Sequence, residues 1–109
     1  MKTDIEIKGQ AVILNVSGKI DLYTSPVLRE TMISLIKRKT GIIVVNLRDV
    51  TETDSSGVAT FVEALKEMSL YGGKLRFVYV SVSVVKIFQF SKLDLIFDIY
   101  TDLDSAVGA

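Results

Sequence analysis

The chain of 109 residues contains neither cysteine nor histidine. The absence of cysteine excludes disulfides, thiol nucleophiles and thiolate metal sites. The absence of histidine excludes a Ser-His-Asp triad and the commonest side-chain metal ligand. Because an enzyme would have to work with carboxylates, Lys, Tyr or Ser alone, we expect a protein that is not an enzyme and that has no metal site and no cofactor.

Net charge and long apolar segments are lacking as well. The chain has 13 basic and 13 acidic residues, so its formal net charge is zero. Nucleic-acid-binding proteins usually carry a basic excess or a basic stripe. Electrostatic binding to a membrane also requires such a basic surface. No apolar run approaches the roughly 20 residues that span a bilayer, and the N-terminus turns polar at once, without the apolar core of a signal peptide. We therefore expect a cytoplasmic protein whose partners are neither nucleic acid nor membrane.

Hydrophobic residues are abundant for so short a chain. They make up 49% of the sequence, and the mean hydropathy is +0.39. This length fits one domain with one core, so residues 1–109 are expected to form a single domain. Two explanations of the high hydropathy stay open: some apolar side chains remain on the surface as a partner site, or the core is unusually rich in Val and Ile.

Several segments have the patterns of β-strands. Residues 4–8 alternate polar and apolar, and residues 11–16 form an apolar run closed by Ser17-Gly18, which together predict a β-hairpin. Residues 42–47 are mostly apolar and β-branched, as in a central strand buried on both faces. Two further strands are expected over the segments 75–80 and 96–100, the second as an edge strand or extended loop.

Helical patterns alternate with these strands. Ser25 before Pro26 predicts a helix start with Ser25 as the cap, and Gly41 is expected to end that helix. Apolar residues keep helical spacing in three later segments: 54–71, 83–90 and a final turn over 101–106. Thr101 is expected to cap the final turn. The alternation predicts an α/β protein with a mixed sheet of four to five strands and about four helices packed on it.

The most informative segment connects the strand at 42–47 to the next helix. Residues 48–54 are expected to form a loop, and such strand-to-helix loops gather at one edge of a sheet and carry function. Asp54 can cap the helix, which puts Ser55 in a first turn with free N–H groups that tolerate a phosphate. Asp-Ser-Ser-Gly is equally an ordinary helix start. With a single Gly and no Lys after it, the segment is not a phosphate-binding P-loop.

Six short motifs follow one another along nearly the whole chain: Gly18-Lys19-Ile20-Asp21, Asn46-Leu47 followed by Val50, Asp54-Ser55-Ser56-Gly57-Val58, Gly72-Gly73-Lys74-Leu75, Ser91-Lys92-Leu93-Asp94 and the residues 96–100. In this order and spacing they resemble the STAS family, in particular the stand-alone bacterial anti-sigma factor antagonists. The chain departs from that pattern at three places: Asn46 in place of Asp, Thr53 in place of an apolar residue, and Val58-Ala59 in place of Leu-Gly.

The resemblance implies a single STAS domain and a phosphorylation switch at Ser55, because the family's phosphoserine directly follows the motif Asp. It further implies that the unphosphorylated protein binds an anti-sigma factor serine/threonine kinase and so releases a sigma factor. Phosphorylation then dissociates the complex, and a PP2C-type phosphatase resets it. The partner-binding residues implied are these: Asp21, Asp54, Ser56 and Gly57. Asp21 also fits a plain turn residue, and Ser56 a capping or spacing residue.

The helix after Ser55 is expected to divide into a buried and an exposed side. Its apolar stripe is expected in the core: Val58, Phe61, Val62 and Leu65. Thr60 and Glu63 are weaker candidates for partner contact on the exposed side.

Three other functions stay open. A partner-switching module of the same fold could control a non-sigma target, such as a secretion system or a phosphatase. A small enzyme could use Asp21, Asp54 and Ser55, but no activating His, Cys or Lys supports a nucleophile. A nucleotide-binding STAS module is the third, without a phosphate loop to support it.

Overall fold

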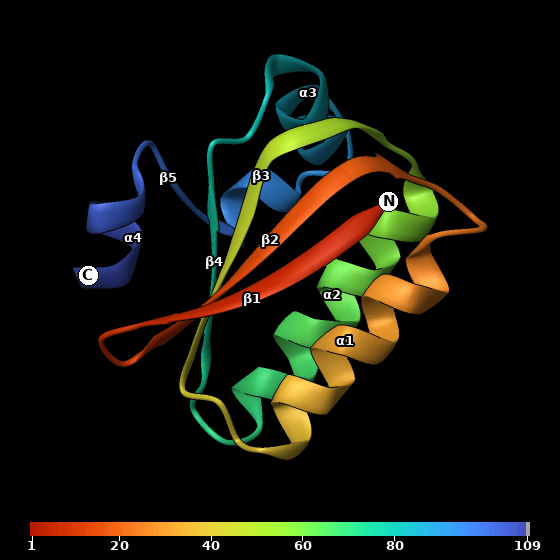
Figure 1. The fold of residues 1–109 in the computed structure, drawn as a ribbon. Helices are drawn as coiled ribbons and strands as arrows, with labels where there is room; N and C mark the ends of the chain where they lie inside the picture. The colour runs from red at the N-terminus through yellow and green to blue at the C-terminus, as the bar shows by residue number, and fades with distance from the viewer. Residues whose placement is uncertain (109) are drawn as a thin grey trace.

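A computed structural model describes residues 1–108. The elements follow one another as β1 (Lys2–Lys8), β2 (Ala11–Ile20), α1 (Ser25–Lys37), β3 (Ile42–Thr53), α2 (Ser55–Ser69), β4 (Lys74–Val78), α3 (Val82–Phe90), the 3₁₀ turn η1 (Leu93–Leu95), β5 (Asp98–Tyr100) and α4 (Leu103–Gly108) (Figure 1). The five strands form one sheet in the order β1-β2-β3-β4-β5. The β1 strand is antiparallel to β2, and the other pairs are parallel. The expected α/β class with a mixed sheet and four helices is confirmed.

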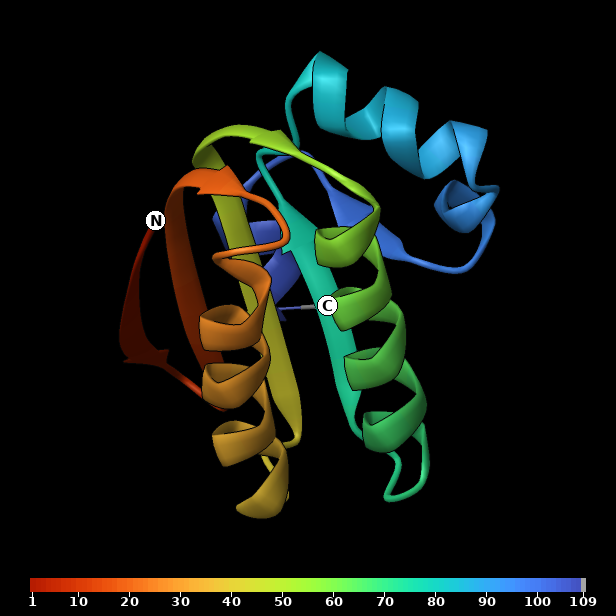
Figure 2. The same ribbon diagram turned by 90° about the vertical axis from the view of Figure 1, so that its right-hand side faces the viewer.

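The sheet is covered on both faces. Helices α1 and α2 lie side by side over one face, and α4 lies over the other (Figures 1 and 2). The larger core joins buried residues of α1, α2 and α3 to Leu14, Ile43 and Val45 of the sheet. A smaller core joins Val44 to Ala106 of α4. Alternate residues of β3 therefore point into different cores, and the prediction of a central strand buried on both faces is confirmed.

The strands β2 and β3 are longer than the sequence pattern predicts. The expected strand end at Ser17-Gly18 and the expected loop at 48–54 are both wrong. Strand β2 continues to Ile20, where it pairs with Thr53 at the end of β3, and the register shifts twice on the way. These irregularities break the period of two on which the prediction depended. Four exposed polar residues of β3 conceal the strand further: Arg48, Asp49, Thr51 and Glu52.

Two helix caps differ from the prediction. The cap of α1 is Thr24, and Ser25 is the first helical residue, buried at 7% exposure. In the last helix, Asp102 takes the place expected for Thr101, because its carboxylate accepts the backbone N–H of Ser105 at 2.8 Å. In both cases an adjacent residue of a capping type takes the position, although the Thr24 side chain makes no capping bond.

The end of α1 comes earlier than expected. The helix ends at Lys37 with Arg38 as its cap. Lys39 then adopts a left-handed conformation with φ of +56°, so the chain has already left the helix before Gly41. The predicted stop at Gly41 is wrong by one turn of helix.

Apolar side chains remain on the surface, as one of the two explanations of the high hydropathy predicts. The exposed large apolar residues are Ile5, Ile7, Leu22, Tyr23, Val27, Leu70, Val82, Phe90, Leu95, Ile96 and Ile99. The core is at the same time rich in Val and Ile, and a partner site formed by the exposed residues stays a prediction. Among the described residues 1–108, no helix is long and apolar enough to cross a membrane.

Candidate functional site

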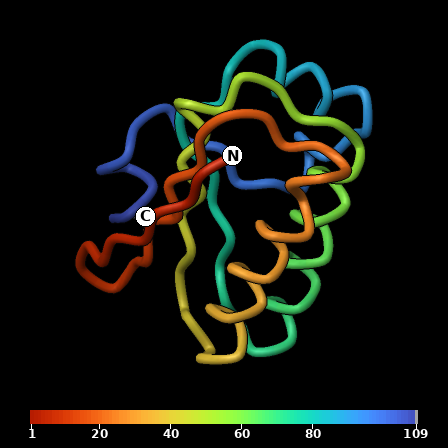
Figure 3. Tube along the Cα trace, turned by 45° about the vertical axis from the view of Figure 1, so that its right-hand side comes forward, coloured from red at the N-terminus to blue at the C-terminus, as the bar shows by residue number. Residues whose placement is uncertain are grey.

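The start of α2 and the loop between β2 and α1 lie side by side at one edge of the sheet (Figure 3). The backbone N–H of Asp54 donates to the carbonyl oxygen of Ile20 at 3.2 Å, which joins the two connections. Because β2 and β3 are parallel, their carboxyl ends meet at this edge. The fold therefore brings Asp21 next to the Asp54-Ser55 segment.

Asp54 is the cap of α2. Its Oδ1 accepts the backbone N–H of Ser56 at 2.9 Å and also the Ser56 hydroxyl. The hydrogen bond from that hydroxyl lowers the pKa of the Asp54 carboxyl most, partial desolvation raises it, and the backbone N–H groups of Ser56, Gly57 and Leu22 lower it further, for a net pKa below the usual value. Asp54 is therefore ionised near neutral pH, and its backbone N–H ties the helix start to Ile20 at the end of β2.

The two neighbouring serines differ in accessibility. Ser55 is the first residue of α2 and is exposed, whereas Ser56 is half-buried. The Ser56 hydroxyl is bonded to the Asp54 carboxylate, so phosphorylating it would cost the helix part of its cap. Ser55 presents its hydroxyl at the positive end of the helix dipole, where a phosphate is tolerated.

Gly57 lies beneath the surface of the site. A Cβ atom at this position would collide with Oγ1 of Thr53 and approach Cγ2 of Ile20 to 2.7 Å. The first turn of α2 packs this closely on the ends of β2 and β3 because Gly57 has no side chain. The structure thus gives Gly57 a packing role that sets the position of Ser55, and the partner contact expected of Gly57 stays a prediction.

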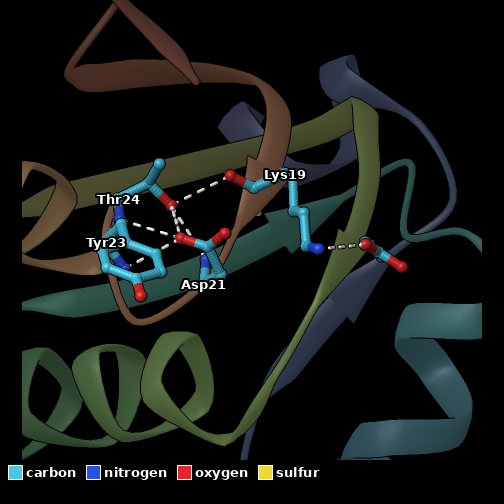
Figure 4. Close-up of polar contacts among 5 residues, drawn as sticks. Lys19, Asp21, Tyr23 and Thr24 are labelled. Atoms are coloured by element: carbon cyan, nitrogen blue, oxygen red, sulfur yellow. Dashed lines mark hydrogen bonds and ion pairs between the residues drawn. The ribbon is translucent and has the colours of Figure 1, made fainter.

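Asp21 and Thr24 hold the β2–α1 loop in place (Figure 4). Oδ1 of Asp21 accepts the backbone N–H groups of Tyr23 and Thr24 at 2.9 and 3.0 Å. The Thr24 hydroxyl oxygen accepts the backbone N–H of Asp21 at 2.8 Å and donates to the carbonyl oxygen of Lys19 at 2.9 Å. Thr24 is occupied by the loop, which explains why its side chain makes no capping bond to α1.

The carboxyl group of Asp21 is held in its ionised form by this loop. Partial desolvation raises its pKa, but hydrogen bonds from Thr24 and Tyr23 and the charge of Lys19 lower it by more, so the pKa lies below its usual value. Asp21 is thus a turn residue and also borders the edge that carries Ser55.

A depression of about 410 Å³ opens at this edge, lined by the charged residues Lys19, Asp21, Glu52 and Asp54 and by the apolar Leu22 and Tyr23. Lys19 Nζ lies 2.9 Å from Oε1 of Glu52. The hydrogen bond and charge of Glu52 raise the pKa of Lys19, and Asp21 and Asp54 add smaller contributions. One cation therefore faces three carboxylates, which leaves the depression negative. Within residues 1–108, no group of His, Cys, Asp and Glu residues is placed to hold a metal ion.

Comparisons with known proteins identify the family of the chain. The model of the STAS domain family matches residues 2–106. The chain belongs to the STAS domain family. The anti-sigma-B factor antagonist of Bacillus subtilis (strain 168) is 29% identical to this STAS domain over 107 residues, covering 98% of this chain and 97% of the relative.

Solved structures share the fold. The crystal structure of a putative anti-sigma factor antagonist from Thermotoga maritima superimposes with a TM-score of 0.92 at 22% identity, covering 97% of this chain and 92% of that one. The structure of the Bacillus cell fate determinant SpoIIAA in the phosphorylated form superimposes with a TM-score of 0.76 at 22% identity, covering 98% and 97%. At these identities the likeness concerns the fold alone.

The exposed side of α2 in this STAS domain differs in part from the prediction. Thr60 is buried at 6% exposure, and its hydroxyl donates to the carbonyl oxygen of Ser56 at 3.0 Å, so it is not available to a partner. Glu63 accepts two hydrogen bonds from Arg29 of α1, both at 2.7 Å. The predicted apolar stripe is confirmed: Val58 and Phe61 are buried, and Val62 and Leu65 pack half-buried against the core.

The sequence analysis overlooked two pairs of residues at the site. Lys19 and Glu52 become neighbours only through the paired ends of β2 and β3, so no local pattern marks them. Leu22 and Tyr23 do carry a signal in the sequence, since two large apolar residues stand between the turn-forming Asp21 and Thr24.

Proposed function

We propose that this STAS domain is an anti-sigma factor antagonist switched by phosphorylation of Ser55. The observation that carries the proposal is the difference between the two serines: Ser55 is exposed, and the Ser56 hydroxyl is engaged by Asp54. The resemblance to a curated anti-sigma-B factor antagonist over nearly the whole chain supports the same function.

In the unphosphorylated state, the protein binds an anti-sigma factor serine/threonine kinase through the edge formed by Asp21, Asp54 and the start of α2. Binding displaces a sigma factor from the kinase, and transcription begins. The kinase transfers a phosphoryl group to Ser55, and the complex then dissociates. A PP2C-type phosphatase, acting in the cytoplasm, removes the phosphate and resets the cycle.

The physical basis of release is local. A phosphate adds about −1.5 to −2 charges and three acceptor oxygens, next to the ionised carboxylates of Asp54 and Asp21. In the free protein, water and the N-terminus of α2 solvate this charge. In the complex, the same dianion must be desolvated beside the carboxylates. A loss of about 3 kcal/mol weakens binding more than a hundredfold, without any refolding of the domain.

The test is to incubate the protein with candidate host kinases and ATP and to locate the phosphate by mass spectrometry. We expect phosphate on Ser55, none on the Ser55→Ala variant, and retained phosphorylation of the matched control Ser56→Ala. The Ser55→Ala variant keeps its affinity for the kinase, whereas Ser55→Asp loses it. Phosphate found on Ser56 alone contradicts the assignment.

A further inference from the structure

We propose that Leu22 and Tyr23 form an apolar anchor on which the kinase docks before it phosphorylates Ser55. This inference rests on the proposed function and adds a binding determinant to it. Leu22 is 69% exposed and Tyr23 is 86% exposed. They are consecutive residues of the β2–α1 loop and both line the depression beside Asp54.

The fold itself makes no use of these two side chains. Neither belongs to either of the two apolar cores or packs against them as a partly buried residue. Single exposed apolar residues are common on protein surfaces, but here two stand together at the edge that carries the phosphorylation site. Because both side chains are exposed, truncating them leaves the folded domain intact. The effect of each truncation on binding can therefore be measured without a loss of folding.

The backbone that carries the anchor is held in position. The N–H of Tyr23 donates to the Asp21 carboxylate at 2.9 Å, and the N–H of Asp54 donates to the carbonyl oxygen of Ile20, two residues before Leu22, at 3.2 Å. Thr24 closes the loop on the carbonyl oxygen of Lys19. A partner therefore meets a preorganised surface and loses little entropy in ordering it. Tyrosine supplies a large, rigid contact area in such positions.

The anchor lies beside the segment that carries the phosphorylation site. Asp54 lines the same depression as Leu22 and Tyr23 and caps the helix whose first residue is Ser55. A protein that binds Leu22 and Tyr23 thus lies beside the start of the helix that carries Ser55. For this reason we assign the anchor to the kinase that modifies Ser55.

The charges around the anchor define the chemistry of the partner. Asp21 and Asp54 are ionised, and within residues 1–108 neither forms an ion pair, because the nearby Lys19 is paired with Glu52 and acts on them only at longer range. The fitting surface is an apolar pocket with a cation at its rim. A second copy of this chain would bring the same carboxylates face to face, and like charges at an interface disfavour that association.

Truncation of the anchor tests the inference. We expect Tyr23→Ala to weaken binding of the unphosphorylated protein to its kinase about thirtyfold, as truncation of a central aromatic contact does, and Leu22→Ala to weaken it about tenfold. In phosphorylation assays both variants raise KM by similar factors and leave kcat unchanged, because neither side chain touches the reacting hydroxyl.

The matched control is Leu70→Ala. Leu70 is 82% exposed and caps the opposite end of α2, so its truncation removes the same kind of side chain far from Ser55. Thermal melting of all three variants checks that the domain stays folded. The control is expected to bind and to be phosphorylated like the wild type.

Three outcomes overturn the inference. If Leu22→Ala and Tyr23→Ala bind like Leu70→Ala while Ser55→Asp still abolishes binding, the anchor is refuted and the switch at Ser55 stands. If the unmodified protein binds no kinase and accepts no phosphate, the proposed function fails and the anchor fails with it. If light scattering shows a wild-type dimer that Tyr23→Ala dissociates, the patch serves self-association.

Discussion

Replacing Gly57 by alanine tests how tightly the fold positions the phosphorylation site. The new Cβ would collide with Oγ1 of Thr53 and lie 2.7 Å from Cγ2 of Ile20. Both neighbours are β-branched, stiff at χ1 and buried at the ends of paired strands. The helix start therefore has to move away from the sheet, and Ser55 moves with it.

The magnitude follows from two opposing effects. Forcing an extra carbon into a packed site costs about 1–3 kcal/mol. Alanine is a better helix former than glycine by up to about 1 kcal/mol, and this gain applies here because the structure shows no positive φ at Gly57. The net expectation is a free energy of unfolding lower by up to about 2 kcal/mol.

Urea and thermal unfolding measure this change, with a fall in Tm of about 4–8 °C for each kcal/mol in a domain of similar size. The matched control is Gly41→Ala, where an added Cβ has no neighbour within 4 Å. A second check is the double variant Thr53→Ala/Gly57→Ala. Because Thr53→Ala removes the colliding hydroxyl, the double variant loses less stability than the sum of the losses of the two single variants. A Gly57→Ala protein as stable as the wild type, with unchanged phosphorylation at Ser55, refutes the packing argument.

Two further predictions concern charge. The pKa of Asp54 and that of Asp21 are lowered in the folded protein, so their contribution to stability is complete above the unfolded-state value of about 3.9 and is lost as the pH falls through the lowered folded values. Urea unfolding from pH 7 downward measures that loss, and an Asp54→Asn variant whose acid profile is as steep as the wild type contradicts it. The exposed Arg29–Glu63 pair contributes less than the packing at Gly57; a double-mutant cycle at low and high salt measures the coupling, and a coupling that high salt leaves unchanged goes against this expectation.

The elements themselves could be predicted because their signals are local. Periodic apolar residues mark α2 and α3, and the β-branched run at 42–47 marks the centre of β3. Asp54 was identifiable as a cap from its place before Ser55-Ser56-Gly57, and the structure confirms it. The ends of β2 and β3 were not predictable, since their register shifts depend on pairing between residues about 30 positions apart.

The candidate site also has some features that the sequence predicts and others that only the structure shows. The motif around Ser55 can be found in the sequence, but Asp-Ser-Ser-Gly alone does not say which hydroxyl is accessible or why glycine is needed. Those properties come from the Ser56–Asp54 hydrogen bond and from the contact of α2 with Thr53 and Ile20. The depression beside Ser55 is likewise assembled from two connections that only the parallel pairing of β2 and β3 brings together.

By itself, the sequence determined the α/β class, the order of strands and helices, and the position of the serine motif at a helix start. These follow from side-chain periodicity and from the chemistry of helix ends, which act over a few residues. Only the tertiary structure decided that Gly57 lies beneath the site, that Thr60 is buried, and that Leu22 and Tyr23 stand exposed beside Asp54. Burial and long-range contact are properties of the packed molecule, because they depend on which distant segments meet at each position.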